Sequence, residues 1–268
     1  MLGRSVSYAA LAAQRLGWEV AVLTSAAPDF VPARDLPGIT CFVQPASATT
    51  RFRNEYDNEG HRFQVLQARA ADLDFSSIPD PWRDPDVLLL CPVAGELHGP
   101  AALSFTAELV GATAQGWLRA FDEDGTVLAR EWTEYASELA GVHALVFSEQ
   151  DVPDAAAHAE RFLQHVPMVL VTRGWQGLRL YDRRDVHEVP TLPRTEEDPT
   201  GAGDVFATAF LLRYHETGDP LEAAAFGACA ASCVVEGLGA SRLGDRGEVE
   251  RRLQERERFL EGEGPGDD

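Results

Sequence analysis

Two glycines and an aspartate stand where an apolar helix is expected to begin. The string Asp198-Pro-Thr-Gly-Ala-Gly-Asp204 leads directly into the apolar run 205–212. Glycines at a helix N-terminus let unpaired backbone N–H groups approach an anion closely, and the helix dipole favours negative charge at that end. These residue types therefore predict a phosphate-binding helix start, with amides supplied by Gly201, Ala202 and Gly203.

Asp204 is expected in the first turn of that helix, beside the bound anion. Its carboxylate could accept a proton from an attacking hydroxyl while the amides stabilise charge on a transferred phosphoryl group. We therefore assign Asp204 as the catalytic base. The competing interpretation is ordinary helix capping, with Thr200 as the N-cap and Asp204 complementing the helix dipole.

The apolar periodicity of the chain predicts an α/β frame for this helix. Strands alternate with helices from residue 86 onward, which implies a mostly parallel sheet covered by helices on both faces. The segment 39–68 is rich in strand-forming residues and predicts a small antiparallel sheet inserted into the main domain. We expect helices at 7–16, 102–110, 154–164, 201–215, 220–235 and 246–260, strands at 20–24, 87–91, 112–115, 144–148 and 168–172, and hairpins at 119–131 and 177–189.

Length and composition predict one folded unit. A chain of 268 residues with 45% apolar content can bury one sizeable core, so we expect a single domain over 1–260 with the insertion at 39–68. The tail 261–268 has no apolar residue to bury and is expected to be disordered.

The charge of the chain argues against several classes of partner. Acidic residues outnumber basic ones by 43 to 23, a formal charge of −20, and every basic residue is arginine. Such a surface repels phosphate backbones and anionic lipid, so we expect no nucleic-acid or membrane role. No apolar run approaches the ~20 residues that span a bilayer, and the start of the chain lacks the layout of a signal peptide, so we expect a cytoplasmic protein.

The string that ends at Asp204 is similar to the C-terminal signature D-T-x-G-A-G-D of the ribokinase-like (PfkB) carbohydrate kinase family, with Pro199 in place of the usual threonine. Four further segments resemble family motifs in the expected order: Gly3-Arg4-Ser-Val-Ser-Tyr8, Ser148-Glu-Gln-Asp151, Val171-Thr-Arg-Gly-Trp-Gln-Gly177 and 227–239. The resemblance implies a three-layer α/β/α ribokinase-like fold with an antiparallel β lid. It also implies ATP-dependent phosphoryl transfer to a hydroxyl of a sugar, polyol or inositol-like compound, with a nucleoside kinase as an alternative.

The resemblance also assigns binding roles to individual residues. The residues expected to touch the nucleotide are Thr172, Gly174, Gly177, Thr200, Ser232 and Gly237. The residues expected to touch the substrate are Gly3, Arg4, Ser5 and Arg51, although Arg51 also fits a solvated strand face. Ser148 and Asp151 replace the asparagine and glutamate of the family's N-x-x-E motif, which organises Mg²⁺ and its waters; they keep oxygen chemistry with a shorter reach.

The chain departs from the family pattern near its start. Family members normally have a first β-strand and an acidic substrate-binding residue before a Gly-Gly segment, whereas here Met1 and Leu2 precede Gly3, and Arg4 takes the place of the second glycine. We expect a truncated or naturally short homologue with impaired activity, and an open sheet edge that favours a homodimer. These departures keep open a second hypothesis, a non-catalytic nucleotide- or metabolite-binding homologue.

Overall fold

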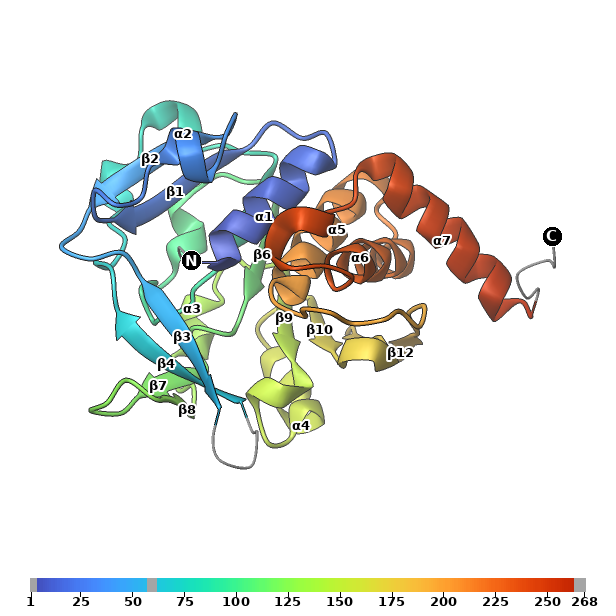
Figure 1. Ribbon diagram of the computed structural model, residues 1–268. Coiled ribbons are helices and arrows are strands. Elements are labelled where there is room, and N and C mark those ends of the chain that lie inside the picture. The colour runs from blue at the N-terminus through green and yellow to red at the C-terminus, as the bar shows by residue number, and fades with distance from the viewer. Residues whose placement is uncertain (1–3, 57–61, 263–268) are drawn as a thin grey trace.

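Six strands form the central sheet of this computed structural model, which describes residues 4–56 and 62–262 (Figure 1). They are β5 (Val87–Leu90), β6 (Leu109–Thr113), β9 (Ala144–Ser148), β10 (Met168–Thr172), β11 (Leu178–Tyr181) and β12 (Val186–Val189), in the spatial order β12-β11-β10-β9-β6-β5. The first four run parallel, and β11 and β12 extend the sheet as an antiparallel hairpin. The expected mostly parallel sheet is confirmed.

Side chains of the central strands alternate between two apolar clusters. Along β9, Leu145 and Phe147 pack into one cluster, whereas Ala144 and Val146 pack into the other. A strand that is buried on both faces carries a continuous apolar run, as this one does. The run therefore identifies β9 as an interior strand of a covered sheet.

Helices cover both faces of the sheet and give three layers (Figure 1). On one face lie α1 (Arg4–Arg15), α5 (Ala202–Thr217), α6 (Pro220–Val234) and α7 (Arg246–Leu260); on the other lie α3 (Tyr135–Glu138) and α4 (Ala155–Phe162). Helix α5 is buried all along 205–212 because it lies between the sheet, α1 and α6. None of the helices in the described part of the chain is both long and apolar enough to cross a bilayer.

Three two-stranded sheets flank the central one: β1 (Ala21–Ala26) with β2 (Thr40–Pro45), β3 (Arg51–Tyr56) with β4 (Arg62–Ala68), and β7 (Arg119–Phe121) with β8 (Val127–Ala129). We call β3 and β4 the lid and β7 and β8 the hairpin. A bridge between Val65 and Thr126 joins the two. Gly3, residues 57–61 between β3 and β4, and the tail beyond residue 262 lie outside the described residues.

The antiparallel sheet predicted at 39–68 was partly wrong. Its first strand, β2, pairs in parallel with β1, with Thr40 beside Ala21. The connection between them contains the short helix α2 (Pro32–Asp35), and a crossover of this kind returns the chain in the same direction. Antiparallel pairing begins only at Arg51.

The helix predicted at 102–110 was also wrong. Only Ala101–Ser104 form a single 3₁₀ turn, and the chain then enters β6, in which all five residues are buried. A short apolar run cannot distinguish a buried helix from a buried strand. The strand predicted at 112–115 is the end of this same strand.

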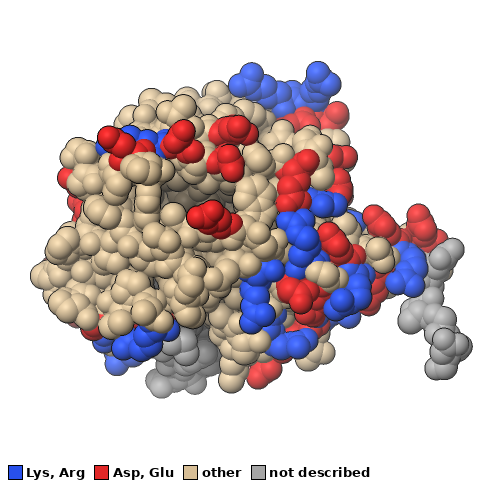
Figure 2. Space-filling view, turned by 90° about the horizontal axis from the view of Figure 1, so that it is seen from above, with Lys and Arg blue, Asp and Glu red and all other residues tan. Residues whose placement is uncertain are grey.

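Residues of both β1 and β5 line a cavity of about 660 Å³. Within residues 4–56 and 62–262, β1 pairs with β2 alone and β5 with β6 alone, so each of these strands has one open edge. The cavity is mostly apolar, with Leu23 and Leu88 among its lining, and reaches Ser5 and Cys91 at one end. Figure 2 shows a hollowed face with acidic side chains around the hollow.

Candidate active site

The site lies where the carboxyl ends of the parallel strands meet the start of α5. Polar residues lie at these carboxyl ends: Cys91 follows β5, and Thr113, Ser148 and Thr172 are the last residues of β6, β9 and β10. Ligands of open α/β sheets bind at this edge, because the loops that follow the strands converge there. The two acids assigned from sequence, Asp151 and Asp204, both belong to this region.

Helix α5 begins at a glycine that no other residue could replace without strain. Gly201 is the N-cap with φ +87°, and a Cβ there would lie 2.4 Å from the Tyr8 ring. Gly203 has open space where its Cβ would be. This backbone leaves the face of the first turn uncovered, as close approach of an anion requires.

The N–H groups of Gly201, Gly203 and Asp204 have no acceptor among the described residues. The N–H of Ala202 instead donates to Pro199 O at 3.2 Å. Unpaired N–H groups at the start of a helix lie at the positive end of its dipole, which favours a bound anion. The capping alternative was wrong in its assignment, because the N-cap is Gly201 and no side chain caps the helix.

Asp198 holds the loop that precedes this helix. Its Oδ1 accepts from the Thr200 N–H at 3.0 Å, and its Oδ2 accepts from the Gly239 N–H at 3.3 Å. Its own N–H donates to Val235 O at 3.2 Å. One carboxylate therefore ties the predicted phosphate-binding turn to the loop that follows α6.

Asp204 is half-buried in the first turn of α5. Burial raises the pKa of its carboxyl to about 7, against a hydrogen bond from Ser5 and the charge of Arg119, which both lower it. Ser5 is buried in the first turn of α1, so the residue predicted to touch substrate also contacts the predicted base. A carboxyl group with this pKa can exchange a proton near neutral pH.

Two residues near Asp204 were missed by sequence reasoning. Arg119 is the first residue of β7, and its charge lowers the pKa of Asp204. The second residue is Cys91: burial raises the pKa of its thiol well above the usual range, and the charge of Asp204 raises it further. No local motif marks either residue.

The two residues predicted to organise Mg²⁺ bond to each other. The Ser148 N–H donates to Asp151 Oδ2 at 2.8 Å, and Ser148 Oγ accepts from the Gln150 N–H at 3.2 Å, which completes a capping box. Burial raises the pKa of Asp151, while the charge of Arg119 lowers it. Across the described ranges, no group of three or more His, Cys, Asp and Glu side chains is arranged to hold a metal ion.

The predicted nucleotide residues fall into two groups. Thr172, Gly174 and Gly177 lie at the end of β10 and in the turn after it, where Trp175 is 76% exposed. Thr200 precedes α5, and Gly237 lies in the loop after α6. The first group thus lies at the carboxyl end of the sheet, and Asp198 links Thr200 to the loop after α6.

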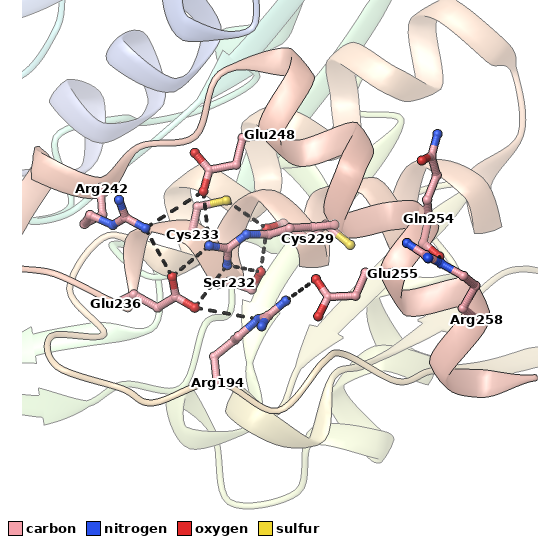
Figure 3. A network of polar contacts seen from close by, with 11 residues as sticks. Arg194, Cys229, Ser232, Cys233, Glu236, Arg242, Glu248, Gln254, Glu255 and Arg258 are labelled. Atoms are coloured by element: carbon pink, nitrogen blue, oxygen red, sulfur yellow. Dashed lines mark hydrogen bonds and ion pairs between the residues drawn. The ribbon is translucent and has the colours of Figure 1, made fainter. Parts of the chain in front are cut away.

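Ser232 lies inside an ionic network between α6 and α7 (Figure 3). Its hydroxyl donates to Cys229 O at 2.7 Å and accepts from Arg252 Nη1 at 3.0 Å. Arg252 also donates to Glu236 Oε2 at 2.7 Å. The Ser232 hydroxyl is therefore already engaged within the helical layer, and its nucleotide role stays a prediction.

Arg51 pairs with a carboxylate at the base of the lid. It donates to Asp29, which also accepts from the Thr49 hydroxyl; these contacts lower the pKa of Asp29. Arg51 is therefore held by Asp29, and a substrate role for it stays a prediction. Gly3 and the side chain of Arg4 lie outside the described residues.

Comparison with known proteins agrees with this geometry. Residues 134–244, which include Asp151, the turn after β10 and the start of α5, match the pfkB family carbohydrate kinase. Residues 134–244 are therefore similar to a pfkB family carbohydrate kinase domain. The family resemblance inferred from the motifs is confirmed.

Proteins similar to this chain include kinases of several small molecules. It is 30% identical over 207 residues to inositol 3-kinase from Arabidopsis thaliana, which covers 74% of this chain and 58% of that protein. It is 39% identical over 82 residues to cytidine kinase from Thermococcus kodakarensis, which covers 29% of this chain and 28% of that protein. The chain thus spans little more than half the length of the inositol kinase.

Solved structures confirm the ribokinase fold. A ribokinase from Thermotoga maritima matches with a TM-score of 0.75 at 23% identity, over 94% of this chain and 87% of that one. A pyrophosphate-dependent kinase of the ribokinase family, complexed with a pyrophosphate analogue and myo-inositol, matches with a TM-score of 0.76 at 18% identity, over 93% and 91%. The three-layer fold predicted from the resemblance is therefore confirmed.

Proposed function

We propose that the chain transfers a phosphoryl group from ATP to a hydroxyl of a sugar, polyol or inositol-like small molecule. The observation that carries this proposal is a carboxyl group with a pKa of about 7 in the same helical turn as N–H groups that have no acceptor in the described part of the chain. Proton removal and anion stabilisation are the two tasks of such a transfer. The inositol 3-kinase relative supports the class of acceptor.

Asp204 acts as the base in this proposal. The acceptor oxygen forms a bond to the γ-phosphorus while the bond from phosphorus to the bridging oxygen breaks. ADP leaves with that electron pair, and the hydroxyl proton passes to the Asp204 carboxylate. The N–H groups at the start of α5 stabilise negative charge on the phosphoryl oxygens.

ATP and Mg²⁺ belong to the same proposal. The nucleotide would lie along the end of β10 and the loop after α6, which Asp198 ties to the start of α5. Mg²⁺ is usually held by one or two carboxylates, waters and substrate phosphates, and it would supply charge neutralisation between the phosphates. One oxygen of Asp151, Oδ2, already accepts from the Ser148 N–H. This carboxylate is therefore better suited to bind a water of the metal than to bind the metal ion directly.

The direct test is release of ADP from MgATP in the presence of single acceptors. The panel contains myo-inositol, other polyols, hexoses, pentoses and nucleosides, and a parallel series replaces ATP with pyrophosphate. We expect turnover with ATP and at least one sugar or inositol. Turnover with pyrophosphate alone would contradict ATP as the donor.

Two other outcomes correspond to the competing functions. Turnover confined to nucleosides would favour the nucleoside kinase, which the cytidine kinase relative supports. Binding of MgATP without turnover of any acceptor would favour a non-catalytic nucleotide-binding homologue. The Arg4 position and the short Ser148 and Asp151 side chains supported that hypothesis from sequence.

We further propose a cytoplasmic homodimer that has no nucleic-acid or membrane partner. The formal charge of −20 supports the exclusion of anionic partners. The open edges of the lid and of β5 in the described part of the chain support association with a second copy.

A further inference from the structure

Arg119 is anchored in the core at its backbone. It opens β7 directly after Trp117 and Leu118, which are each 2% exposed. Trp117 stacks on Trp132 with 4.9 Å between the ring centroids. Because this aromatic pair is closely packed, the backbone just before Arg119 is held in one conformation, and the Arg119 side chain therefore starts from a fixed point.

On one side, the Arg119 guanidinium contacts both strands of the lid. Nη2 donates to Gln64 Oε1 on β4 at 3.1 Å, and Cζ lies 5.7 Å from the centroid of the Phe52 ring on β3. The lid and the hairpin are joined again where the Leu66 N–H donates to Gly125 O at 2.7 Å. The position of the guanidinium is therefore coupled to the position of the lid.

The segment that leads to Arg119 leaves the carboxyl end of β6, which is the neighbour of β9 in the sheet. The Ala114 N–H holds the start of this segment by donating to Val146 O of β9 at 2.9 Å, and Asp151 lies in the loop after β9. The charge of Arg119 also acts on Asp204 of α5 and lowers the pKa of that carboxyl against its burial. Two carboxylates offer a phosphate no donors and repel its charge. A cation between the lid and these acids offsets that repulsion.

We propose that Arg119 is a further catalytic residue, which binds the transferred phosphoryl group between the lid and the start of α5. This assignment rests on the proposed phosphoryl transfer. A guanidinium presents a planar fork of N–H donors that suits phosphate oxygens and stays charged throughout the pH range. Arg119 exchanges no proton; it stabilises charge that spreads over the oxygens as the bond to the leaving group breaks.

The kinetic test compares Arg119→Gln and Arg119→Lys with wild type. The matched control is Arg130→Gln, which removes an arginine of the segment after β8 whose partner, Glu134, is solvent-exposed. We expect Arg119→Gln to lower kcat by about 100-fold or more with the KM for the acceptor within about threefold, and Arg119→Lys to recover part of the loss. Wild-type kcat in Arg119→Gln would overturn the proposal.

A binding test separates this proposal from the proposed function. ADP with aluminium fluoride, which resembles a phosphoryl group in transfer, is titrated into each variant in the presence of acceptor. We expect wild type to bind this mixture at least about tenfold more tightly than ADP, and Arg119→Gln to lose that gain while keeping its ADP affinity. Retention of the gain in Arg119→Gln overturns the Arg119 proposal and leaves the kinase standing.

The same titration also tests the Arg119 proposal if the wild-type protein turns over no acceptor. If wild type shows the gain with aluminium fluoride but turns over no acceptor in the panel, the proposed acceptor class fails, and loss of the gain in Arg119→Gln still supports Arg119. If wild type binds no nucleotide, both proposals are overturned.

Discussion

Asp204 is subject to opposing influences on its ionisation. Burial raises its pKa to about 7, while the Ser5 hydroxyl from α1 and the charge of Arg119 from β7 lower it. The Cys91 thiol at the end of β5 is nearby and stays neutral, because burial raises its pKa well above the usual value. Burial and groups on two other elements, α1 and β7, thus set the pKa of the predicted base near neutral pH.

The pH dependence of kcat/KM follows from this carboxyl. The base acts when ionised, so kcat/KM should fall about tenfold per pH unit below an apparent pKa near 7. Ser5→Ala removes a hydrogen bond that favours the ionised form, so the acid limb should move to higher pH, whereas Ser137→Ala on α3 should leave it unchanged. An acid limb near the ordinary pKa of aspartate, about 4, would contradict this assignment.

The same carboxyl contributes to the pH dependence of stability. Folding raises its pKa from 3.8, an ordinary value for aspartate, to about 7, so between these values the folded state binds more protons than the unfolded state. Its contribution to the free energy of unfolding therefore falls as pH rises through this window. Asp204→Asn should remove that slope, which chemical denaturation at pH 5 and pH 8 measures.

Two alanine substitutions separate stability from activity at the helix start. Gly201→Ala places a Cβ against the Tyr8 ring at a positive φ and should destabilise the fold by about 2 kcal/mol or more. Gly203→Ala meets open space at an ordinary helical position, so the free energy of unfolding should stay or rise by up to about 1 kcal/mol. Its methyl group faces the predicted anion, so kcat should fall. Thermal unfolding and ADP release measure the two effects, and an unchanged kcat in Gly203→Ala would count against the anion site.

At the scale of elements, sequence periodicity predicted some bounds and failed at others for identifiable reasons. Strand β10 and helix α7 have the predicted bounds, since Pro167 and a glycine turn bracket the strand and Asp245 caps the helix. The region 102–110 was wrong because an apolar run fits a buried strand as well as a helix.

The candidate site was predictable where it is local. Gly201 to Asp204 form one helical turn, so a single motif located the base and its amides. Arg119 was not predictable, because its relation to Asp204 depends on how the hairpin packs against the lid. A contact between distant segments leaves no trace in spacing along the chain.

Substitutions in the ionic network between α6 and α7 test whether α7 only supports the fold or also affects nucleotide binding. Arg252, which is 8% exposed, contacts Ser232, Glu236 and Glu248. Arg252→Met leaves the buried Ser232 hydroxyl and two half-buried carboxylates with fewer donors, and should lower the free energy of unfolding by about 2 kcal/mol. The matched Arg258→Met removes a guanidinium whose one hydrogen-bond partner among the described residues is Gln254 O, at 3.4 Å, and should change the free energy of unfolding by less than about 0.5 kcal/mol.

Kinetics of the same variant decide whether this network is structural. If α7 only supports α6, Arg252→Met should keep the KM for ATP within about twofold of wild type. A large rise in that KM without loss of stability would instead assign the Ser232 region to the nucleotide site.

At the scale of the whole molecule, charge and open strand edges act together. Acidic and arginine side chains alternate along the projecting C-terminal helix, and acids gather around the hollowed face (Figure 2). Two-stranded sheets such as the lid are marginally stable without a covering surface. In residues 4–56 and 62–262, β3 and β4 pair only with each other apart from the Val65 bridge.

A second copy of the chain would cover these edges. We expect light scattering coupled to gel filtration to give twice the chain mass of 29.2 kDa at micromolar concentration. Because the charge of −20 opposes association at long range, the dimer fraction should rise with salt. A monomer at every salt concentration would contradict the homodimer.

The central claim is that the first turn of α5 performs phosphoryl transfer with Asp204 as its base. The most direct measurement is ADP release by wild type and Asp204→Asn with the best acceptor, together with MgATP binding to both. The account predicts that Asp204→Asn loses at least about 1000-fold in kcat and keeps its affinity for MgATP, because the amides remain. An Asp204→Asn variant that retains wild-type turnover would contradict it.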